Sequence, residues 1–276
     1  GADPTQGHVK YLTQPEAIAA GRIHANATHA FIGVDHFDRA PNGRGSIRLE
    51  SKSVYTYGLF LLDVDHLPYG CGTWPAWWTV GNLWPQQGEI DIIEGINNQE
   101  NNTMVVHTVP DGCTCQLHDS PAEQTGTTWP ISGCSGGGLS YYLKVEETKP
   151  RSYGGPGYEG GVYAMEWTAE TVKVWFFPRG QEPADAVDGQ PTPDNWGKPT
   201  MFVDMKQCAL AGKYKDHKVI INTTFCGGWA GIQSLWESSG CARQTGQPTC
   251  VDHVTQNPNA FRNAYWLVRG MKVWQR

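Results

Sequence analysis

Three carboxylates lie within six residues of this sequence, in the stretch GEIDIIEG at residues 88–95. Glu89 and Asp91 are two residues apart, and Glu94 follows three residues later, with isoleucine between the acids. Side chains alternate between the two faces of a regular strand, so Glu94 would lie on the opposite face from the other two acids. A β-bulge with one extra residue at 92–93 would return Glu94 to their face, and we expect one there.

Carboxylates gathered on one face could hydrolyse a glycosidic bond. A retaining enzyme needs one carboxylate as nucleophile and one carboxylic acid to protonate the leaving oxygen, about 5–5.5 Å apart. The long side chains of Glu89 and Glu94 can lean together, and the shorter Asp91 can share a proton with a neighbour. Mutual repulsion is expected to raise the pKa of one glutamate, which stays protonated near neutral pH while its partner is ionised.

Two other interpretations of the acids remain open. The first is the solvated polar face of an edge strand, which needs no chemistry. The second is a calcium site, because hard oxygen ligands bind such clusters. The stretch lacks the Asx-rich loop that usually surrounds the ion, so we assign no metal ligand.

Aromatic residues crowd the segment before the acids. Trp74, Trp77, Trp78 and Trp84 lie within eleven residues. The C–H faces of sugar rings stack on indole, so aromatics beside paired acids are typical of a saccharide cleft. Tryptophan also packs in cores, and we expect at least one of these four to be buried in that way.

The elements that must position these residues are strands. Hydrophobic alternation has a period of two in many β-branched and aromatic segments bounded by turn residues. We therefore predict an all-β fold, an antiparallel β-sandwich or jelly roll. In the segment at 171–178, Val172, Val174 and Phe176 should face the core, with Lys173 and Trp175 on the other face. Two short helices are expected, around 14–20 and 254–264. The remaining predicted strands lie at 29–37, 46–51, 56–67, 103–109, 161–167, 218–225 and 264–275.

We expect the chain, residues 1–276, to form a single domain, because sandwiches of this length commonly do. Residues 110–161 are rich in Gly, Ser, Thr and Pro and hold three of the eight cysteines. This composition predicts a long, disulfide-pinned surface loop that could form one wall of a cleft.

Charge and cysteine content restrict the function class. The net charge is −6 without a basic run, so neither nucleic acid nor an anionic membrane surface is an expected partner. The cysteines form no CxxC pair, which favours up to four disulfides of undetermined pairing over structural zinc. Sequons at Asn26, Asn101 and Asn222 are glycosylation candidates and agree with an oxidising compartment. We expect a secreted, extracellular protein, in a mature or trimmed form because Gly1 onward lacks a signal-peptide pattern.

These motifs together resemble glycoside hydrolase family 16. The stretches GTWPAWW and WPQQGEIDIIEG, followed by VVHT and much later by FCGGWAG, are similar to fungal laminarinase-like endo-β-1,3(4)-glucanases. The ExDxxE spacing resembles the bulged laminarinase type. The resemblance implies a jelly roll whose concave sheet carries an open cleft for β-glucan, with no cofactor required; a structural calcium is possible but not assignable.

The resemblance also implies roles for individual residues. Glu89 resembles the nucleophile, Asp91 its assisting acid, Glu94 the acid/base and His107 a histidine on the adjacent strand. The expected substrate-binding residues are Trp78 and Trp84 on the non-reducing side of the cut, Trp74 beside them, Trp229 on the leaving-group side and, further out, Arg44. A structural role for His107 remains open.

The expected activity is that of a retaining endo-β-glucanase acting on β-1,3 or mixed β-1,3/1,4 linkages, and the expected partner is the polysaccharide, bound by a monomer. Two alternatives remain. One is a lectin-like β-glucan-binding protein on the same sandwich, although such proteins typically lack a catalytic glutamate. The other is a β-glucan transglycosylase, in which a sugar hydroxyl replaces water.

Overall fold

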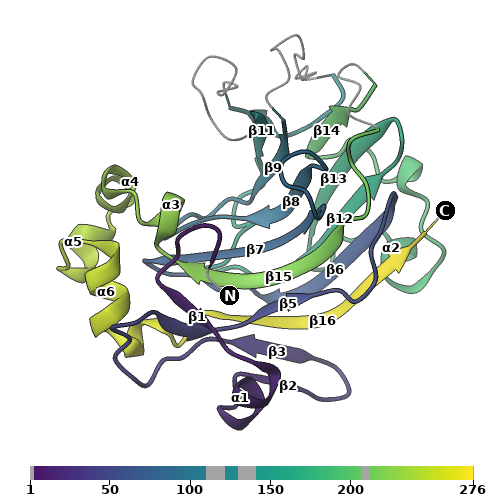
Figure 1. The fold of residues 1–276 in the computed structure, drawn as a ribbon. Coiled ribbons are helices and arrows are strands. Elements are labelled where there is room, and N and C mark those ends of the chain that lie inside the picture. The colour runs from purple at the N-terminus through teal and green to yellow at the C-terminus, as the bar shows by residue number, and fades with distance from the viewer. Residues whose placement is uncertain (1–2, 110–121, 130–140, 207–211, 276) are drawn as a thin grey trace.

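Two seven-stranded β-sheets pack face to face in the computed structural model (Figure 1). The structure describes residues 3–109, 122–129, 141–206 and 212–275. Every pairing within these two sheets is antiparallel. The long strands bend along their length, so the sandwich is curved (Figure 1). The predicted jelly-roll sandwich is confirmed.

The first sheet contains the three acids on its central strand. Its strand order is β10 (Thr127–Thr128), β11 (Tyr141–Glu146), β9 (Thr103–Thr108), β8 (Glu89–Glu94), β7 (Thr73–Val80), β15 (Lys218–Phe225) and β5 (Arg48–Glu50). Three strands therefore lie on either side of β8.

The second sheet closes the other side of the core. Its order is β14 (Met201–Asp204), β13 (Thr171–Pro178), β12 (Gly161–Trp167), β6 (Gly58–His66), β16 (Tyr265–Trp274), β3 (Ala30–Gly33) and β2 (Ile23–Ala25). A separate parallel pair joins β1 (Val9–Tyr11) to β4 (Arg44–Ser46).

The helices are short, and four of them gather at one end of the sandwich (Figure 1). These are α3 (Gly227–Ala230), α4 (Gln233–Ser238), α5 (Cys241–Thr245) and α6 (Cys250–Gln256), with η2 (Pro258–Phe261) following. Elsewhere lie α1 (Gln14–Ala19), α2 (Ala184–Asp188) and η1 (Pro193–Asn195). In the part of the chain that the structure describes, no helix is long and apolar enough to cross a bilayer. The predicted helices around 14–20 and 254–264 correspond to α1 and to the end of α6 with η2.

The main core lies between the two sheets. Val172, Val174 and Phe176 on β13 face it, as their alternation predicts. Trp175 differs from the expectation of a half-exposed face, because it is only 3% exposed. The ring of Trp196, from the segment after β13, lies 5.5 Å from its ring and covers it in a second apolar cluster. Both faces of β13 are therefore buried.

The prediction of a continuous loop over residues 110–161 is wrong in part. Two strands lie inside it, β10 and β11, and β11 pairs with β9 along its full length. Leu143 and Val145 are buried in the core, so this strand follows the same alternation as the others. Four cysteines lie outside the described residues, and so does their predicted pairing. They are Cys113, Cys115 and Cys134 in this region and Cys208 later in the chain.

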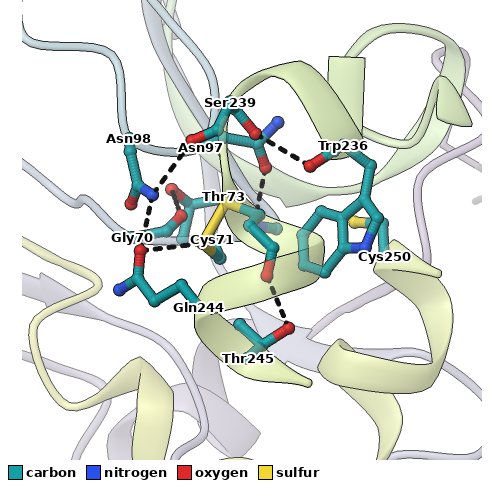
Figure 2. The surroundings of a disulfide bond; sticks show 12 residues. Gly70, Cys71, Thr73, Asn97, Asn98, Trp236, Ser239, Gln244, Thr245 and Cys250 are labelled. Carbon is teal, nitrogen blue, oxygen red and sulfur yellow. Dashed lines mark hydrogen bonds between the residues drawn. A yellow bond between two sulfur atoms is a disulfide. The ribbon is translucent and has the colours of Figure 1, made fainter. Parts of the chain in front are cut away.

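Two disulfides attach the helical end to the sandwich. Cys71, just before β7, is bonded to Cys241 in α5, and Cys226, at the end of β15, is bonded to Cys250 in α6. Figure 2 shows the surroundings of the first bond, where the side chain of Asn98 donates to Gln244 Oε1 at 2.8 Å. The sheet that holds the acids and the helices that follow it are thus covalently connected.

Candidate active site

The β-bulge expected in β8 is present. Asp91 pairs with Val105 on β9, and the next pair is Glu94 with Thr103, so three steps on β8 match two on β9. The pairing with β7 shifts at the same place, between Trp77 and Trp78. Because one residue is extra, Glu94 returns to the face of Glu89 and Asp91. All three acids line the same cleft.

The isoleucines of this strand lie in the core, as predicted. Ile90, Ile92 and Ile93 are each 0% exposed and belong to the main apolar cluster. Their burial fixes which face of β8 the acids occupy, because a slip by one residue would move the whole apolar set to the cleft.

Asn102 stabilises the bulge, and sequence analysis did not identify it. A bulge leaves backbone groups unpaired, and a buried unpaired group is costly. The Asn102 side chain is fully buried; its Nδ2 donates to the Ile92 carbonyl at 2.8 Å, and its Oδ1 accepts from the Glu94 N–H at 3.1 Å. One amide therefore satisfies both sides of the irregularity and holds the backbone that carries Glu94.

The glycines at both ends of the motif make room for two tyrosine rings. A Cβ at Gly88 would lie 2.4 Å from the ring of Tyr214, and one at Gly95 would lie 2.6 Å from that of Tyr153. Gly88 also has a φ of +77°, which favours glycine. Each tyrosine hydroxyl then donates to a nearby carbonyl, Tyr214 to that of His107 and Tyr153 to that of Gly95. The strand ends are thereby fixed.

Burial dominates the electrostatics of the three acids. It is the largest cause that raises the pKa of Glu89, of Asp91 and of Glu94, and repulsion between the acids raises those of Glu89 and Asp91 further. A raised pKa was predicted for one glutamate only, whereas the pKa of both glutamates is raised, and desolvation rather than repulsion is the main cause. Glu89 and Asp91 also share a hydrogen bond, so this pair can hold one proton and one negative charge.

Glu94 has a different environment from the other two acids. The indole Nε1 of Trp74 donates to its Oε1 at 2.8 Å. This hydrogen bond and the positive charges of His107 and Lys144 oppose the effect of burial on the Glu94 pKa. The three acids thus divide into a proton-sharing pair and a separate carboxyl with its own donor.

His107 lies on β9 directly opposite Glu89. Its Nε2 is 3.4 Å from Asp91 Oδ2, a buried oxygen without a hydrogen-bond donor among the described residues. Single ligand atoms of Glu89, Asp91 and His107 lie within 4.8 Å of one another, close enough to hold a metal ion. The hydrogen bond between Glu89 and Asp91 and the contact of His107 with Asp91 account for this proximity, and we assign no metal to the three residues.

The acids open into a cleft of about 490 Å³, with Trp74, Trp78 and Trp84 among its walls. Trp78 is held in place from two sides. Its Nε1 donates to Asn222 Oδ1 at 2.7 Å, and the Arg48 guanidinium lies 4.9 Å from its ring centroid. Asn222 and Arg48 are further cleft residues that sequence analysis did not assign to the site.

The other two predicted tryptophans occupy different environments. Trp77 is fully buried in the main core, which confirms the expectation that one of the four would be. Trp229, in α3, packs edge-on against Trp74 with ring centroids 5.5 Å apart, so it lies beside the residue that bonds Glu94.

Arg44 does not reach the cleft, and its expected contact with sugar is a wrong prediction. Its side chain is 0% exposed. The guanidinium donates to the Val254 carbonyl and pairs with Asp35 Oδ2 at 3.1 Å, and it lies 4.6 Å from the ring centroid of Phe261. A buried cation needs such partners, and here they join β4 to the helical end of the molecule.

The three sequons differ in accessibility. Asn26 is exposed, in a turn in which its Oδ1 accepts from the Thr28 and His29 N–H groups. Asn101 is partly exposed. Asn222 is 6% exposed and its amide is engaged with Trp78 and Tyr11, so it is not available for a glycan and this candidate is corrected.

Comparison with known proteins agrees with this geometry. A family model described as the XgeA-like catalytic GH16 domain matches residues 1–274. Laminarinase 16A of Phanerochaete chrysosporium, solved with β-glucan in donor and acceptor sites, is 38% identical with a TM-score of 0.89 and covers 100% of this chain and 93% of its own. The chain belongs to glycoside hydrolase family 16.

Two further relatives of this GH16 chain differ in their names. An endo-1,3(4)-β-glucanase of Arthroderma benhamiae is 39% identical over 99% of this chain, which spans 60% of that relative's length. An elongating GH16 β-1,3-glucosyltransferase is 37% identical with a TM-score of 0.87, covering 100% of this chain and 93% of its own. The GH16 fold therefore supports both hydrolysis and sugar transfer among its relatives.

Proposed function

We propose that the protein is a retaining endo-β-glucanase that cleaves β-1,3 or mixed β-1,3/1,4-glucan. The observation that carries the proposal is the bulge in β8, which brings Glu94 to the side of Glu89 and Asp91 on the floor of an aromatic cleft. The GH16 relatives named as glucanases and laminarinase support the choice of substrate.

The proposed reaction has two steps. In the first, the Glu89 carboxylate attacks the anomeric carbon, the glycosidic C–O bond breaks, and Glu94 gives its proton to the leaving oxygen. In the second, Glu94 takes a proton from water, whose oxygen attacks the same carbon and releases Glu89. Two displacements on one carbon retain its configuration.

Asp91 and His107 support the nucleophile in this scheme. The hydrogen bond between Glu89 and Asp91 raises the pKa of Glu89 and lowers that of Asp91, so the shared proton favours Glu89. In this scheme that proton passes to Asp91 when Glu89 attacks. His107 faces the pair from β9 and reduces the repulsion around it when it is protonated. Trp78 and Trp84 are the proposed stacking surfaces for glucose units on the non-reducing side.

Incubation with laminarin tests this function. We expect new reducing ends, with the β-anomer as the first product in the NMR spectrum. Release of the α-anomer would contradict retention. Saturable binding without new ends would instead support the lectin-like alternative.

Sugar transfer is a second candidate, favoured by the likeness to the elongating glucosyltransferase. It differs only in the second step, in which a sugar hydroxyl replaces water at the glycosyl-enzyme. Sizing the products at high oligosaccharide concentration separates the two, because transfer yields chains longer than the substrate.

We further propose that residues 1–276 act as one secreted, monomeric catalytic domain. Two disulfides and the exposed sequon at Asn26 support passage through an oxidising compartment. Light scattering of the purified chain and analysis of Asn26 glycosylation after expression in a secreting host are the corresponding tests.

A further inference from the structure

A chain of hydrogen bonds connects Trp78 in the cleft with the N-terminal segment. Trp78 Nε1 donates to Asn222 Oδ1 at 2.7 Å, and Asn222 Nδ2 donates to the Tyr11 hydroxyl at 3.1 Å. The Tyr11 hydroxyl in turn donates to Asp3 Oδ1 at 3.3 Å. Side chains from β7, β15, β1 and the residues before β1 are thereby joined, and we call these four residues the Trp78 hydrogen-bond chain.

The direction of this chain is fixed by its two ends. An indole N–H can only donate, and an ionised carboxylate can only accept. The Asn222 amide must therefore turn its oxygen toward Trp78, and the Tyr11 hydroxyl must turn its proton toward Asp3. Burial, followed by the charge of Asp3, raises the pKa of Tyr11, so this proton is present at neutral pH. Because Asn222 is buried, loss of a neighbour leaves its amide without a partner, which is costly.

Asp3 also holds the N-terminal segment against the end of β15. Its Oδ2 accepts from the Gly7 N–H at 2.9 Å, from the Thr224 hydroxyl at 3.0 Å and from the Thr5 hydroxyl. The Thr5 carbonyl accepts from the Gly228 N–H at 2.8 Å. A Cβ at Gly7 would lie 2.0 Å from Thr224 Oγ1, so the close approach of the segment to β15 requires glycine there.

The N-terminal segment belongs to the cleft as well as to the fold. Asp3, Pro4 and Thr5 lie in the cleft wall together with Trp78. Tyr11 is not among the described residues that line the cleft. An effect of Tyr11 on substrate must therefore pass through its neighbours, which makes it the cleanest position at which to test the chain.

We propose that Tyr11 and Asp3 are positioning residues that set the orientation of the Trp78 indole for glucan binding. This inference rests on the function proposed above. The Arg48 guanidinium lies over the ring of Trp78, 4.9 Å from its centroid, and the bond to Asn222 fixes the direction in which the indole N–H points. An indole that is already ordered loses less conformational entropy when a sugar ring stacks on it, so the chain favours binding by preorganisation.

Steady-state kinetics of Tyr11→Phe test the proposal. This variant keeps the ring and removes the hydroxyl. With laminarihexaose we expect KM to rise about threefold to tenfold, up to the effect of one stacking contact. The value of kcat should stay within about twofold, because the change affects the binding of substrate and transition state alike. An unchanged KM would overturn the proposal.

Tyr69→Phe is the matched control. The Tyr69 hydroxyl also accepts from an asparagine amide, Asn263 Nδ2 at 3.0 Å, and it lies outside the cleft. Loss of the same kind of hydrogen bond at this position should leave KM and kcat unchanged. A rise in KM equal to that of Tyr11→Phe would show that the effect does not depend on Trp78 and would overturn the proposal.

A double-variant cycle asks whether Tyr11 acts through Trp78. In a Trp78→Ala background there is no indole to orient, so adding Tyr11→Phe should change KM little further. If Tyr11 only supports the fold, or acts on substrate by another route, its effect on KM should be the same in both backgrounds. Additive effects would overturn the proposal.

A measurement without substrate separates this test from that of the proposed function. In protein labelled with 5-fluorotryptophan, the ¹⁹F resonance of Trp78 is identified by its loss in Trp78→Phe. Tyr11→Phe and Asp3→Ala should shift or broaden this resonance, and Tyr69→Phe should not. If the unaltered protein cleaves no glucan, the proposed function fails, while the resonance still decides whether the chain orients Trp78. A Trp78 resonance that neither Tyr11→Phe nor Asp3→Ala alters would overturn the positioning role.

Discussion

At the scale of single residues, the three acids of β8 are distinguished by their surroundings. Glu89 and Asp91 share a hydrogen bond beside His107, and Glu94 accepts a hydrogen bond from Trp74. Identical side-chain chemistry can therefore serve two roles, because the environment of each carboxyl decides whether it gives up or keeps its proton.

Replacement of the proposed nucleophile, Glu89, is the most direct test at this scale. Glu89→Gln keeps the size of the side chain and removes the attacking carboxylate, so we expect turnover on laminarin to fall by more than about 10³-fold. Binding of laminari-oligosaccharides, followed by calorimetry, should remain within a few-fold. Full activity in this variant would remove Glu89 from its role.

The pH dependence of activity follows from the raised pKa values. Glu94 must be protonated to act as acid, so kcat/KM should fall as the pH rises through its raised pKa. It should also fall at low pH, where Glu89 and Asp91 both bind protons and no nucleophile remains. A bell-shaped profile with its optimum on the acid side of neutral is expected from initial rates. A flat profile between about pH 4 and 9 would contradict the acid/base assignment.

At the scale of elements, the bulge in β8 depends on a side chain from the adjoining segment. Asn102 lies directly before β9 and pairs with the backbone on both sides of the extra residue. The position of Glu94 is thus set by a fully buried hydrogen-bonding amide, and it depends on the integrity of the β8–β9 connection.

Asn102→Ala tests this dependence. It leaves the Ile92 carbonyl and the Glu94 N–H unpaired in the interior, which should lower the free energy of unfolding by about 1–3 kcal/mol. Because Glu94 is then less well placed, kcat should fall more than KM changes. Asn101→Ala, its partly exposed neighbour, is the control and should change both quantities little. Denaturant titration and steady-state kinetics give the two readouts.

At the scale of the whole molecule, the sandwich and its helical end are joined by long-range links. Cys71 and Cys241 are 170 residues apart in sequence, and Cys226 and Cys250 are 24 apart. Arg44 adds a buried polar link between β4 and α6. Trp229 lies in α3, where the helical end meets the sandwich, and it packs against Trp74, which lines the cleft. The stability of the helical end is therefore coupled to this wall of the cleft.

Removal of either disulfide should therefore cost stability, and the bond that closes the longer loop should cost more. We expect the Cys71→Ala/Cys241→Ala pair to lower the free energy of unfolding by about 2–5 kcal/mol, because a bond that closes a longer loop restricts the unfolded chain more. Cys226→Ala/Cys250→Ala should cost about 1.7 kcal/mol less, because its loop is shorter. Equal or reversed losses in denaturant titrations would show that native-state packing at the helices, rather than loop length, decides the effect.

The buried acids should also make the stability of the whole fold dependent on pH. A carboxyl whose pKa is raised on folding favours the folded state below its unfolded pKa and loses that contribution as the pH rises through the folded pKa. Asp91→Asn removes one such group, so its Tm advantage over the unaltered protein should grow from about pH 5 to pH 8. Differential scanning calorimetry across this range is the measurement. A Tm difference that stays constant with pH would contradict the raised Asp91 pKa.

Most of the architecture could be predicted from local sequence alone. The period-two alternation locates strands such as β12, β13 and β15 with their observed bounds, because each side chain's face depends only on its neighbours in the chain. The bulge was predictable for the same reason, since the two-then-three spacing of the acids conflicts with the burial of the isoleucines. In contrast, β11 was missed because its Gly- and Ser-rich surroundings favoured a loop, although YYLKVE itself alternates.

What only the tertiary structure decided concerns partners that are distant in sequence. Arg44 is buried because its guanidinium meets the Val254 carbonyl, 210 residues away. Asn222 matches a sequon, yet its side-chain amide accepts a hydrogen bond from Trp78 of another strand. Lys144, on β11, and Trp229, in α3, are brought together only in the folded chain. A local pattern determines which face a side chain takes, but exposure and contacts depend on which segments pack against that face, and this is a property of the folded chain.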